Sequence, residues 1–153
     1  MQTFNFTEKY LSHIPALQLL MQLGYTYLSP HQALQERGGR TSNLLLEGIL
    51  YRQLKKLNRI QHKGNEYHFS EANIQEAIQK LKNIKYDGLQ KTNEAIYDLL
   101  TLSEGFPQRL EGSLRSPYLK YIDWKNLHNN VFHVVPEFVV ERSRSVETIR
   151  PDI

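Results

Sequence analysis

The sequence contains no cysteine among its 153 residues. Disulfide frameworks and thiol chemistry are therefore excluded for this chain, and the composition fits a reducing cytoplasm. No apolar run approaches the roughly 18 residues that a bilayer span requires, so no membrane partner is predicted. Met1-Gln2-Thr3-Phe4 lacks the basic and apolar regions of a signal peptide. We expect a cytoplasmic protein.

Zinc-binding and phosphate-loop motifs are also missing. The six histidines have no cysteine partners and no HExxH spacing, and the glycines at 38 and 39 lack the GxxxxGK[ST] spacing. What the sequence does contain is a slight excess of positive charge, with a net charge of +3 and an isoelectric point near 9.1. This balance is compatible with a polyanionic partner without identifying one.

Amphipathic helical patterns fill the first two thirds of the chain. The opening helix places four apolar residues on one face, namely Tyr10, Ile14, Leu17 and Met21. It either kinks at Pro15 or begins near Ser12, which would place the proline in the first turn. Gly24 is a predicted C-cap, and Tyr25–Leu28 is a candidate short strand.

The middle of the chain predicts a succession of capped helices. The first is opened by the capping box Ser29-Pro30-His31-Gln32 and ended by Gly38-Gly39. The second is capped by Thr41 or Ser42 and runs to about Asn58, and the third is capped by Ser70 and broken at Asp87-Gly88. The fourth covers Leu89–Leu102. Lys63-Gly64-Asn65 predicts a turn, and a hairpin is one option for the connection Ser103–Ser116.

The last quarter changes to runs rich in β-branched and aromatic residues. Tyr118–Trp124 and Val131–Arg142 are predicted to be extended, and a third extended run begins at Glu147. Pro136 is predicted to mark a bulge or a sheet edge. Runs of helices followed by strands indicate an α+β fold.

Four short runs near the carboxyl end carry a resemblance to a known family. They are Tyr121-Ile122-Asp123-Trp124, Asn130-x-Phe132-x-Val134, Phe138-x-Val140-Glu141 and Arg150-Pro151-Asp152-Ile153. In this order they resemble the amino-terminal nuclease region of the R (restriction) subunit of type I restriction–modification enzymes. The resemblance implies a PD-(D/E)xK nuclease domain over 1–153, in which an opening helix packs on a closing β region and a mainly helical insertion occupies about 29–102.

The resemblance also implies a metal site. It assigns Asp152 and Glu8 to catalysis and to metal ligation. Phosphodiester hydrolysis needs a cation that neutralises developing charge, and Mg²⁺ prefers oxygen ligands such as carboxylates. The alternatives are that Asp152 is a terminal turn carboxylate and that Glu8 is a first-turn acid favoured by the helix dipole.

The Glu-x-Lys half of the motif does not follow Asp152 within these 153 residues. We therefore expect this chain alone to be inactive as a nuclease. In the intact subunit the resemblance implies Mg²⁺-dependent cleavage of unmodified DNA after translocation driven by ATP, which binds a motor encoded downstream. The implied partners are double-stranded DNA and the modification and specificity subunits.

Two groups of basic residues are candidate DNA contacts. One follows a predicted helix face and comprises Arg52, Lys55, Lys56 and Arg59; the other flanks Asp152 and comprises Arg142, Arg144 and Arg150. The alternative for the first group is a solvated helix face. A different class of function is also open, namely a non-catalytic helical module that binds DNA or a partner subunit through residues 41–85.

Overall fold

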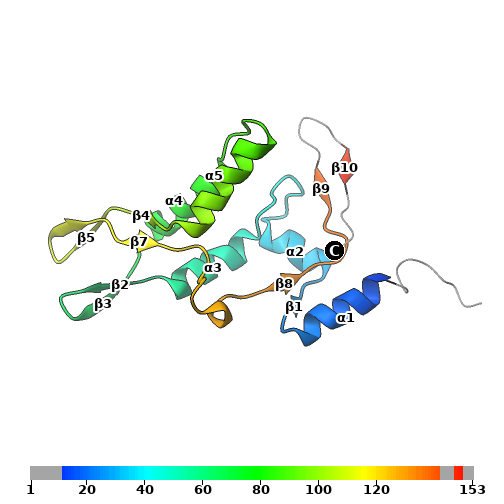
Figure 1. Ribbon diagram of the computed structural model, residues 1–153, viewed down its shortest axis with the longest axis horizontal. Coiled ribbons are helices and arrows are strands. Elements are labelled where there is room, and N and C mark those ends of the chain that lie inside the picture. Colours follow the sequence, from blue (N-terminus) through cyan, green and yellow to red (C-terminus); the bar gives the residue numbers. More distant parts are fainter. Residues whose placement is uncertain (1–11, 142–146, 150–153) are drawn as a thin grey trace, which may run out of the picture. The chain divides into compact units, whose positions relative to one another are not determined.

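A computed structural model describes residues 12–141 and 147–149 (Figure 1). Within these residues the helices are α1 (Ile14–Gln22), α2 (Pro30–Glu36), α3 (Glu47–Leu57), α4 (Glu71–Lys82), α5 (Leu89–Thr101) and the 3-10 helix η2 (Leu127–Asn129). The strands are β1 (Thr26–Tyr27), β2 (Arg59–His62), β3 (Asn65–His68), β4 (Glu104–Gly105), β5 (Gln108–Leu110), β6 (Ser113–Arg115), β7 (Tyr118–Leu119), β8 (His133–Val134), β9 (Val140–Glu141) and β10 (Thr148–Ile149). Helices mixed with small sheets confirm the predicted α+β class.

The starts of α2 and α4 follow the predicted capping signals, whereas α4 ends at Lys82, before the break predicted at Asp87-Gly88. Ser29 and Gln32 form the complete capping box of α2, and the Ser70 hydroxyl accepts the backbone N–H of Asn73 at the start of α4. The helix α1 begins at Ile14, so Pro15 lies in its first turn and causes no kink within the helix. Gly24, with a φ of 95°, ends α1.

The prediction for α3 was wrong at its start and right at its end, which was predicted at about Asn58. The helix begins at Glu47 rather than at Thr41 or Ser42, because the carbonyl groups of Thr41 and Asn43 accept the guanidinium of Arg37. It ends at Leu57, so Arg59 lies on strand β2 and does not continue the helix face.

The chain divides into two compact units. Unit 1 comprises Met1–Leu46 and Val131–Ile153, and unit 2 comprises Glu47–Asn130. Unit 2 is thus inserted into the sequence of unit 1. Its bounds differ from the predicted helical insertion at about 29–102, and the assignment of 1–153 to a single nuclease domain stays a prediction.

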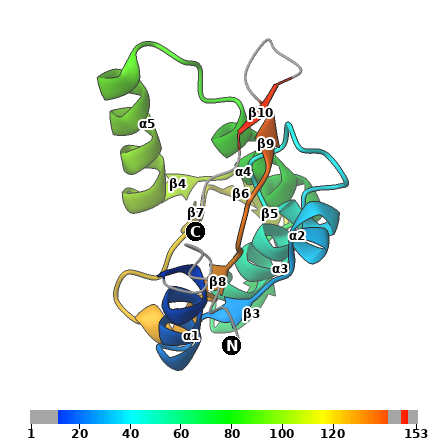
Figure 2. The ribbon, with the colours of Figure 1, turned by 90° about the vertical axis from the view of Figure 1, so that its right-hand side faces the viewer.

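Unit 1 contains a parallel strand pair with a helix beside it. Strand β1 pairs with β8, with Thr26 opposite His133 and Tyr27 opposite Val134. Helix α1 contacts both strands, as both ribbon views show (Figures 1 and 2). Strands β9 and β10 form a separate antiparallel pair. Pro136 falls in the break between β8 and β9, as predicted.

Unit 2 has a hydrophobic core of its own. Its buried members come from every helix and hairpin between α3 and β7 except α5: Leu54, Ile60, Phe69, Ile74, Ala77, Ile78, Phe106, Leu110, Leu119 and Tyr121. Helix α5 adds the partly buried Leu99 and Leu100. The side chain of Gln53 donates to the carbonyl of Asn129 at 2.8 Å, which joins the two ends of the unit.

Candidate functional site

Five residues that the sequence assigns to the metal site and its surroundings lie outside the described residues: Asp152, Glu8, Arg142, Arg144 and Arg150. Their roles therefore stay predictions. Within 12–141 and 147–149, no group of three or more His, Asp or Glu side chains could hold a metal ion. The described strand nearest to Asp152 in sequence is β10, which is paired with β9.

The basic residues at the end of α3 and on β2 are engaged with acids of unit 2. Lys55 Nζ lies 3.4 Å from the hydroxyl of Tyr51 and 3.6 Å from Glu71 Oε1. The contact with Tyr51 first, and that with Glu71 second, raise the pKa of Lys55. Arg59 Nε lies 3.5 Å from Glu66 Oε1. Exposed ion pairs of this kind are weak, so a phosphate can compete for the same cations.

The other two cations of the predicted DNA-binding face, Arg52 and Lys56, are exposed on α3. The four residues thus do not share one helix face, because Arg59 belongs to β2. DNA contact by the group stays a prediction. It would now involve the end of α3 together with the start of a hairpin.

Asp123, from the run Tyr121–Trp124, is a buried carboxylate that fixes the asparagine-rich segment after it. Its Oδ2 accepts Lys120 Nζ at 2.9 Å and Asn129 Nδ2 at 3.0 Å, and its Oδ1 accepts the backbone N–H of Asn126 at 3.1 Å. These hydrogen bonds, that of the Asn129 amide first, hold the pKa of Asp123 far below its usual range. The carboxylate therefore has a structural role.

The lowered pKa of Asp123 predicts a dependence of stability on pH. The unfolded carboxyl has a pKa of about 3.9, so the charged group stabilises the fold above that pH, and the contribution is lost as pH falls towards the folded value. We expect Asp123→Asn to flatten the decrease in stability below about pH 4. Urea unfolding midpoints between pH 2 and 6 measure how the free energy of unfolding depends on pH. The matched variant Asp98→Asn, on the exposed side of α5, should keep the wild-type slope; equal slopes in all three proteins would contradict the prediction.

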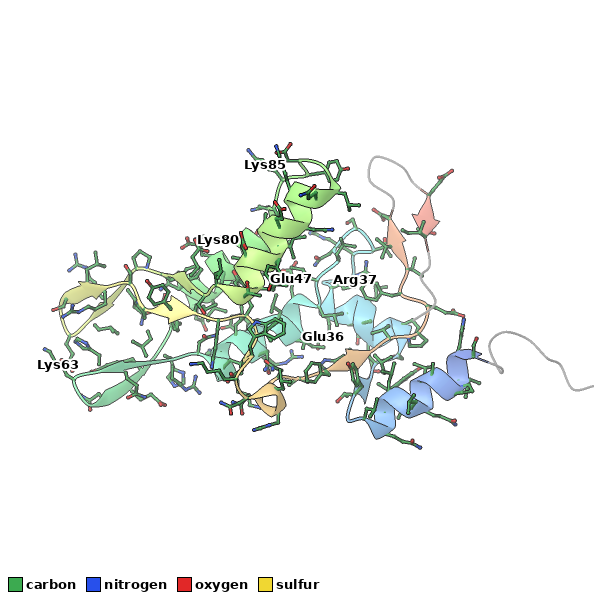
Figure 3. The ribbon with its side chains drawn as sticks, in the orientation of Figure 1. Glu36, Arg37, Glu47, Lys63, Lys80 and Lys85 are labelled. Carbon is green, nitrogen blue, oxygen red and sulfur yellow. The ribbon has the colours of Figure 1, made fainter. Side chains whose placement is uncertain are left out.

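Arg37 organises the described part of unit 1 and is labelled in Figure 3. Its side chain is 3% exposed although it carries a charge. Nη1 donates to the carbonyl of Val139 at 2.7 Å, and the other nitrogens donate to the carbonyls of Asn43 and Thr41. Its Cζ lies 4.2 Å from the centroid of the Phe138 ring. Arg37 therefore joins the end of α2 to the segment that enters β9.

A second contact fixes β9 to the same loop. Thr41 Oγ1 donates to Glu141 Oε1 at 2.6 Å, and the Glu141 N–H donates to the Thr41 carbonyl at 3.3 Å. Burial lowers the pKa of Arg37, and the nearby Glu141 partly offsets that effect. The guanidinium stays charged at neutral pH, because the usual arginine pKa lies far above it.

Beside Arg37 lies a mainly apolar cavity of about 270 Å³. It is lined by Pro30, His31, Ala33, Leu34, Arg37, Thr41, Val135, Glu137, Phe138 and Val139. Glu137 contributes the single carboxyl group of this lining. Among the described residues, the lining of the cavity therefore lacks the paired carboxylates that a Mg²⁺ site for phosphodiester hydrolysis needs.

A family model described as the type I restriction enzyme R protein N terminus matches residues 5–153. The chain belongs to this family. Neither a curated protein nor a solved structure matches it. The match confirms the resemblance inferred from the four carboxyl-terminal runs. It also covers the part of unit 2 before Tyr121, where no matching run was identified in the sequence.

For this R-protein N terminus, the described residues contain no helix long and apolar enough to cross a membrane. Sequence reasoning missed the role of Arg37, because its partner carbonyl at Val139 is 102 residues away. It also missed Asp123 as a hydrogen-bond centre. The signal that could have indicated it is the cluster of asparagines immediately after it.

Proposed function

We propose that this chain is the nuclease-bearing amino-terminal region of a type I restriction enzyme R subunit. In the complete subunit, the reaction is Mg²⁺-dependent cleavage of unmodified double-stranded DNA after ATP-dependent translocation. The single observation that carries this proposal is the family match over residues 5–153. The run Arg150-Pro151-Asp152-Ile153 supports it, because it has the residue types of the first half of a PD-(D/E)xK motif.

In this proposal Asp152 and Glu8 hold the cation. Two carboxylates form a hard, anionic oxygen donor set, which fits Mg²⁺ and does not fit a soft metal. When bound, Mg²⁺ neutralises charge that develops on the phosphate. The arginines at 142, 144 and 150 would bind neighbouring phosphates. The modification and specificity subunits are the proposed protein partners, and ATP binds only at the motor outside these 153 residues.

The test is Asp152→Ala in the R subunit that carries this chain, assembled with its modification and specificity subunits. We expect plasmid cleavage to be abolished while ATP hydrolysis stays at the wild-type rate, because the motor is a separate site. The control Asp98→Ala removes an exposed carboxylate from α5 and should cleave normally. Cleavage by the Asp152 variant at the wild-type rate would refute the assignment.

A second candidate is a non-catalytic binding module within the same chain, for which residues 41–85 were predicted. The observation that favours it is the cluster of ten buried apolar residues among the described part of the chain, which lies in unit 2. A unit with its own core is able to present a binding surface independently of a metal site. Binding of duplex DNA that survives both chelation of Mg²⁺ and Asp152→Ala would support this candidate.

A further inference from the structure

Two short hairpins of unit 2 have the same construction. Strands β2 and β3 are joined by Lys63-Gly64, and strands β5 and β6 by Glu111-Gly112. In both turns the two central residues have positive φ angles, 48° and 84° in the first and 48° and 82° in the second. This is the turn geometry that matches the twist of a two-residue hairpin. We refer to the two hairpins, residues 59–68 and 108–115, as the hairpin arm.

The two hairpins are tied together near their turns. Tyr67 Oη donates to Glu111 Oε1 at 2.5 Å, and Lys63 Nζ lies 3.2 Å from Glu111 Oε2. The Tyr67 and Lys63 contacts lower the pKa of Glu111, so this carboxylate is charged at neutral pH. Glu111, in the turn between β5 and β6, therefore binds the hairpin formed by β2 and β3.

A second tie lies at the other end of the arm. Gln108 Nε2 donates to the His68 carbonyl at 2.8 Å, and Gln108 Oε1 accepts the Ser70 N–H at 2.8 Å. Asn73 Nδ2 donates to the same Gln108 oxygen at 3.2 Å and to the Pro107 carbonyl at 3.1 Å. The hairpins are thus fixed to each other at both ends and to the start of α4. Such an arm is organised before it meets a partner.

The strand registers separate an inner and an outer face. In the first hairpin Ile60 lies opposite Tyr67, and both pack on the core that also contains Leu110 of the second hairpin. In the second hairpin Arg109 lies opposite Leu114, on the face opposite to Leu110. Arg109 is therefore held on the face away from the core. Arg115 lies opposite Gln108, on the same face as Leu110, and is exposed at the open end of the hairpin.

The arm carries more cations than acids. Its charged residues are Arg59, Lys63, Arg109 and Arg115 against Glu66 and Glu111. Glu66 and Glu111 are engaged with Arg59 and Lys63, respectively. Arg109 and Arg115 are exposed, and among the described residues no acid contacts either of them.

The surplus extends to the whole of unit 2. This unit has 13 lysines and arginines against 10 aspartates and glutamates, so it accounts for the entire net charge of +3 of the chain. The remaining residues, which form unit 1, are balanced. A polyanion is therefore attracted to unit 2 first, and the arm offers it two cations without a competing acid.

We propose that the hairpin arm binds the phosphate backbone of duplex DNA, as a site separate from the nuclease residues. Arg109 and Arg115 are the principal contacts. A two-stranded ribbon is narrow enough to follow a DNA groove, and arginine binds phosphate through a planar, permanently charged group. The contact is sequence-independent, because phosphates carry no base information. The inference rests on the proposed function, which makes DNA the substrate.

The experiment measures fluorescence anisotropy of a labelled 30-base-pair duplex with the purified 153-residue chain in EDTA. We expect Arg109→Ala/Arg115→Ala to weaken binding about tenfold and to reduce the slope of log K against log salt by about 2, one for each phosphate contact. The matched control is Lys85→Ala/Lys125→Ala, which removes the same charge from exposed residues of unit 2 outside the arm. It should bind within twofold of the wild-type chain.

A charge-preserving variant separates binding from folding. Arg109→Lys/Arg115→Lys should recover most of the affinity, because lysine also neutralises phosphate. Equal losses in the arm and control variants would overturn the proposal, since they would show only a general charge effect. DNA binding by the arm variant at the wild-type affinity would also overturn the proposal, and lost binding to an acidic partner subunit would then show that the arm binds protein. Because EDTA removes Mg²⁺, a failure here leaves the Asp152 test intact, and a failure of that test leaves this one intact.

Discussion

Replacing Phe106 with alanine is expected to lower the free energy of unfolding of unit 2 by about 3–5 kcal/mol. The ring is fully buried in the cluster that contains Leu54 and Ile78. The Phe106 N–H donates to the Pro117 carbonyl at 3.0 Å, so its backbone is fixed and cannot move to fill the space. Lys80 Nζ lies 4.6 Å from the ring centroid and would lose that contact as well.

Urea unfolding followed by the fluorescence of Trp124 measures this effect, because Trp124 is the single tryptophan and belongs to unit 2. Its Nε1 donates to the Leu100 carbonyl at 3.0 Å, so the signal reports on the fold around α5. The control is Tyr118→Ala, since Tyr118 is 75% exposed and should cost less than about 0.5 kcal/mol. A Phe106 variant as stable as this control would show that the core is not placed as described.

The second large effect is expected for Arg37→Ala, which should destabilise unit 1 by about 3 kcal/mol. The substitution removes the donor for three backbone carbonyls, those of Thr41, Asn43 and Val139. Each buried carbonyl that loses its donor keeps the cost of removal from water without a compensating hydrogen bond, which destabilises the folded state. The contact with the Phe138 ring is lost at the same time.

Amide hydrogen exchange is the suitable measurement, because it resolves unit 1 from unit 2. The Gly39 N–H, which donates to the Leu34 carbonyl at 2.9 Å, should exchange faster by roughly two orders of magnitude, the equivalent of about 3 kcal/mol. Arg37→Lys should recover little, because one ammonium cannot reach three carbonyls that a planar guanidinium reaches. Arg40→Ala, at an exposed position, should leave exchange unchanged. Wild-type exchange in the Arg37 variant would contradict its role.

Local signals in the sequence predicted the parts of the fold that depend on neighbouring residues. Ser29 and Ser70 cap helices because each is followed by a helix whose first N–H groups need an acceptor. Gly88 precedes α5 with a φ of 79°, a conformation that glycine adopts without strain. Lys63-Gly64 was predicted as a turn and forms one.

Features that depend on contacts between residues far apart in the sequence were not predicted. Helix α3 starts late because the side chain of Arg37 occupies carbonyls of the 41–43 segment, and that side chain is itself held by Val139. No local pattern reveals a partner so distant. The end of α3, in contrast, was predicted at about Asn58, and the side chain of that residue bonds the carbonyl and N–H of Lys120.

The candidate site was predicted through family resemblance rather than through patterns in the chain. Asp152 and Glu8 have no spacing of their own that distinguishes a metal ligand from a surface acid, so their assignment depends on the neighbouring runs. Arg109 and Arg115 were not singled out, because charge alone does not show which arginines lack an acid. Only the register of β5 and β6 and the contacts of Glu111 reveal that difference.

The hydrogen bond between Gln53 and Asn129 has a consequence for the order of events during synthesis on the ribosome. Thr26 of β1 pairs with His133 of β8, so the parallel pair can form only after the residues up to β8 have emerged. By then unit 2 has all of its residues and can already have folded. Closing a loop costs entropy according to its number of free residues, and a folded segment whose ends are pinned together contributes few. Translation therefore favours folding of the inserted unit 2 before assembly of unit 1 around it.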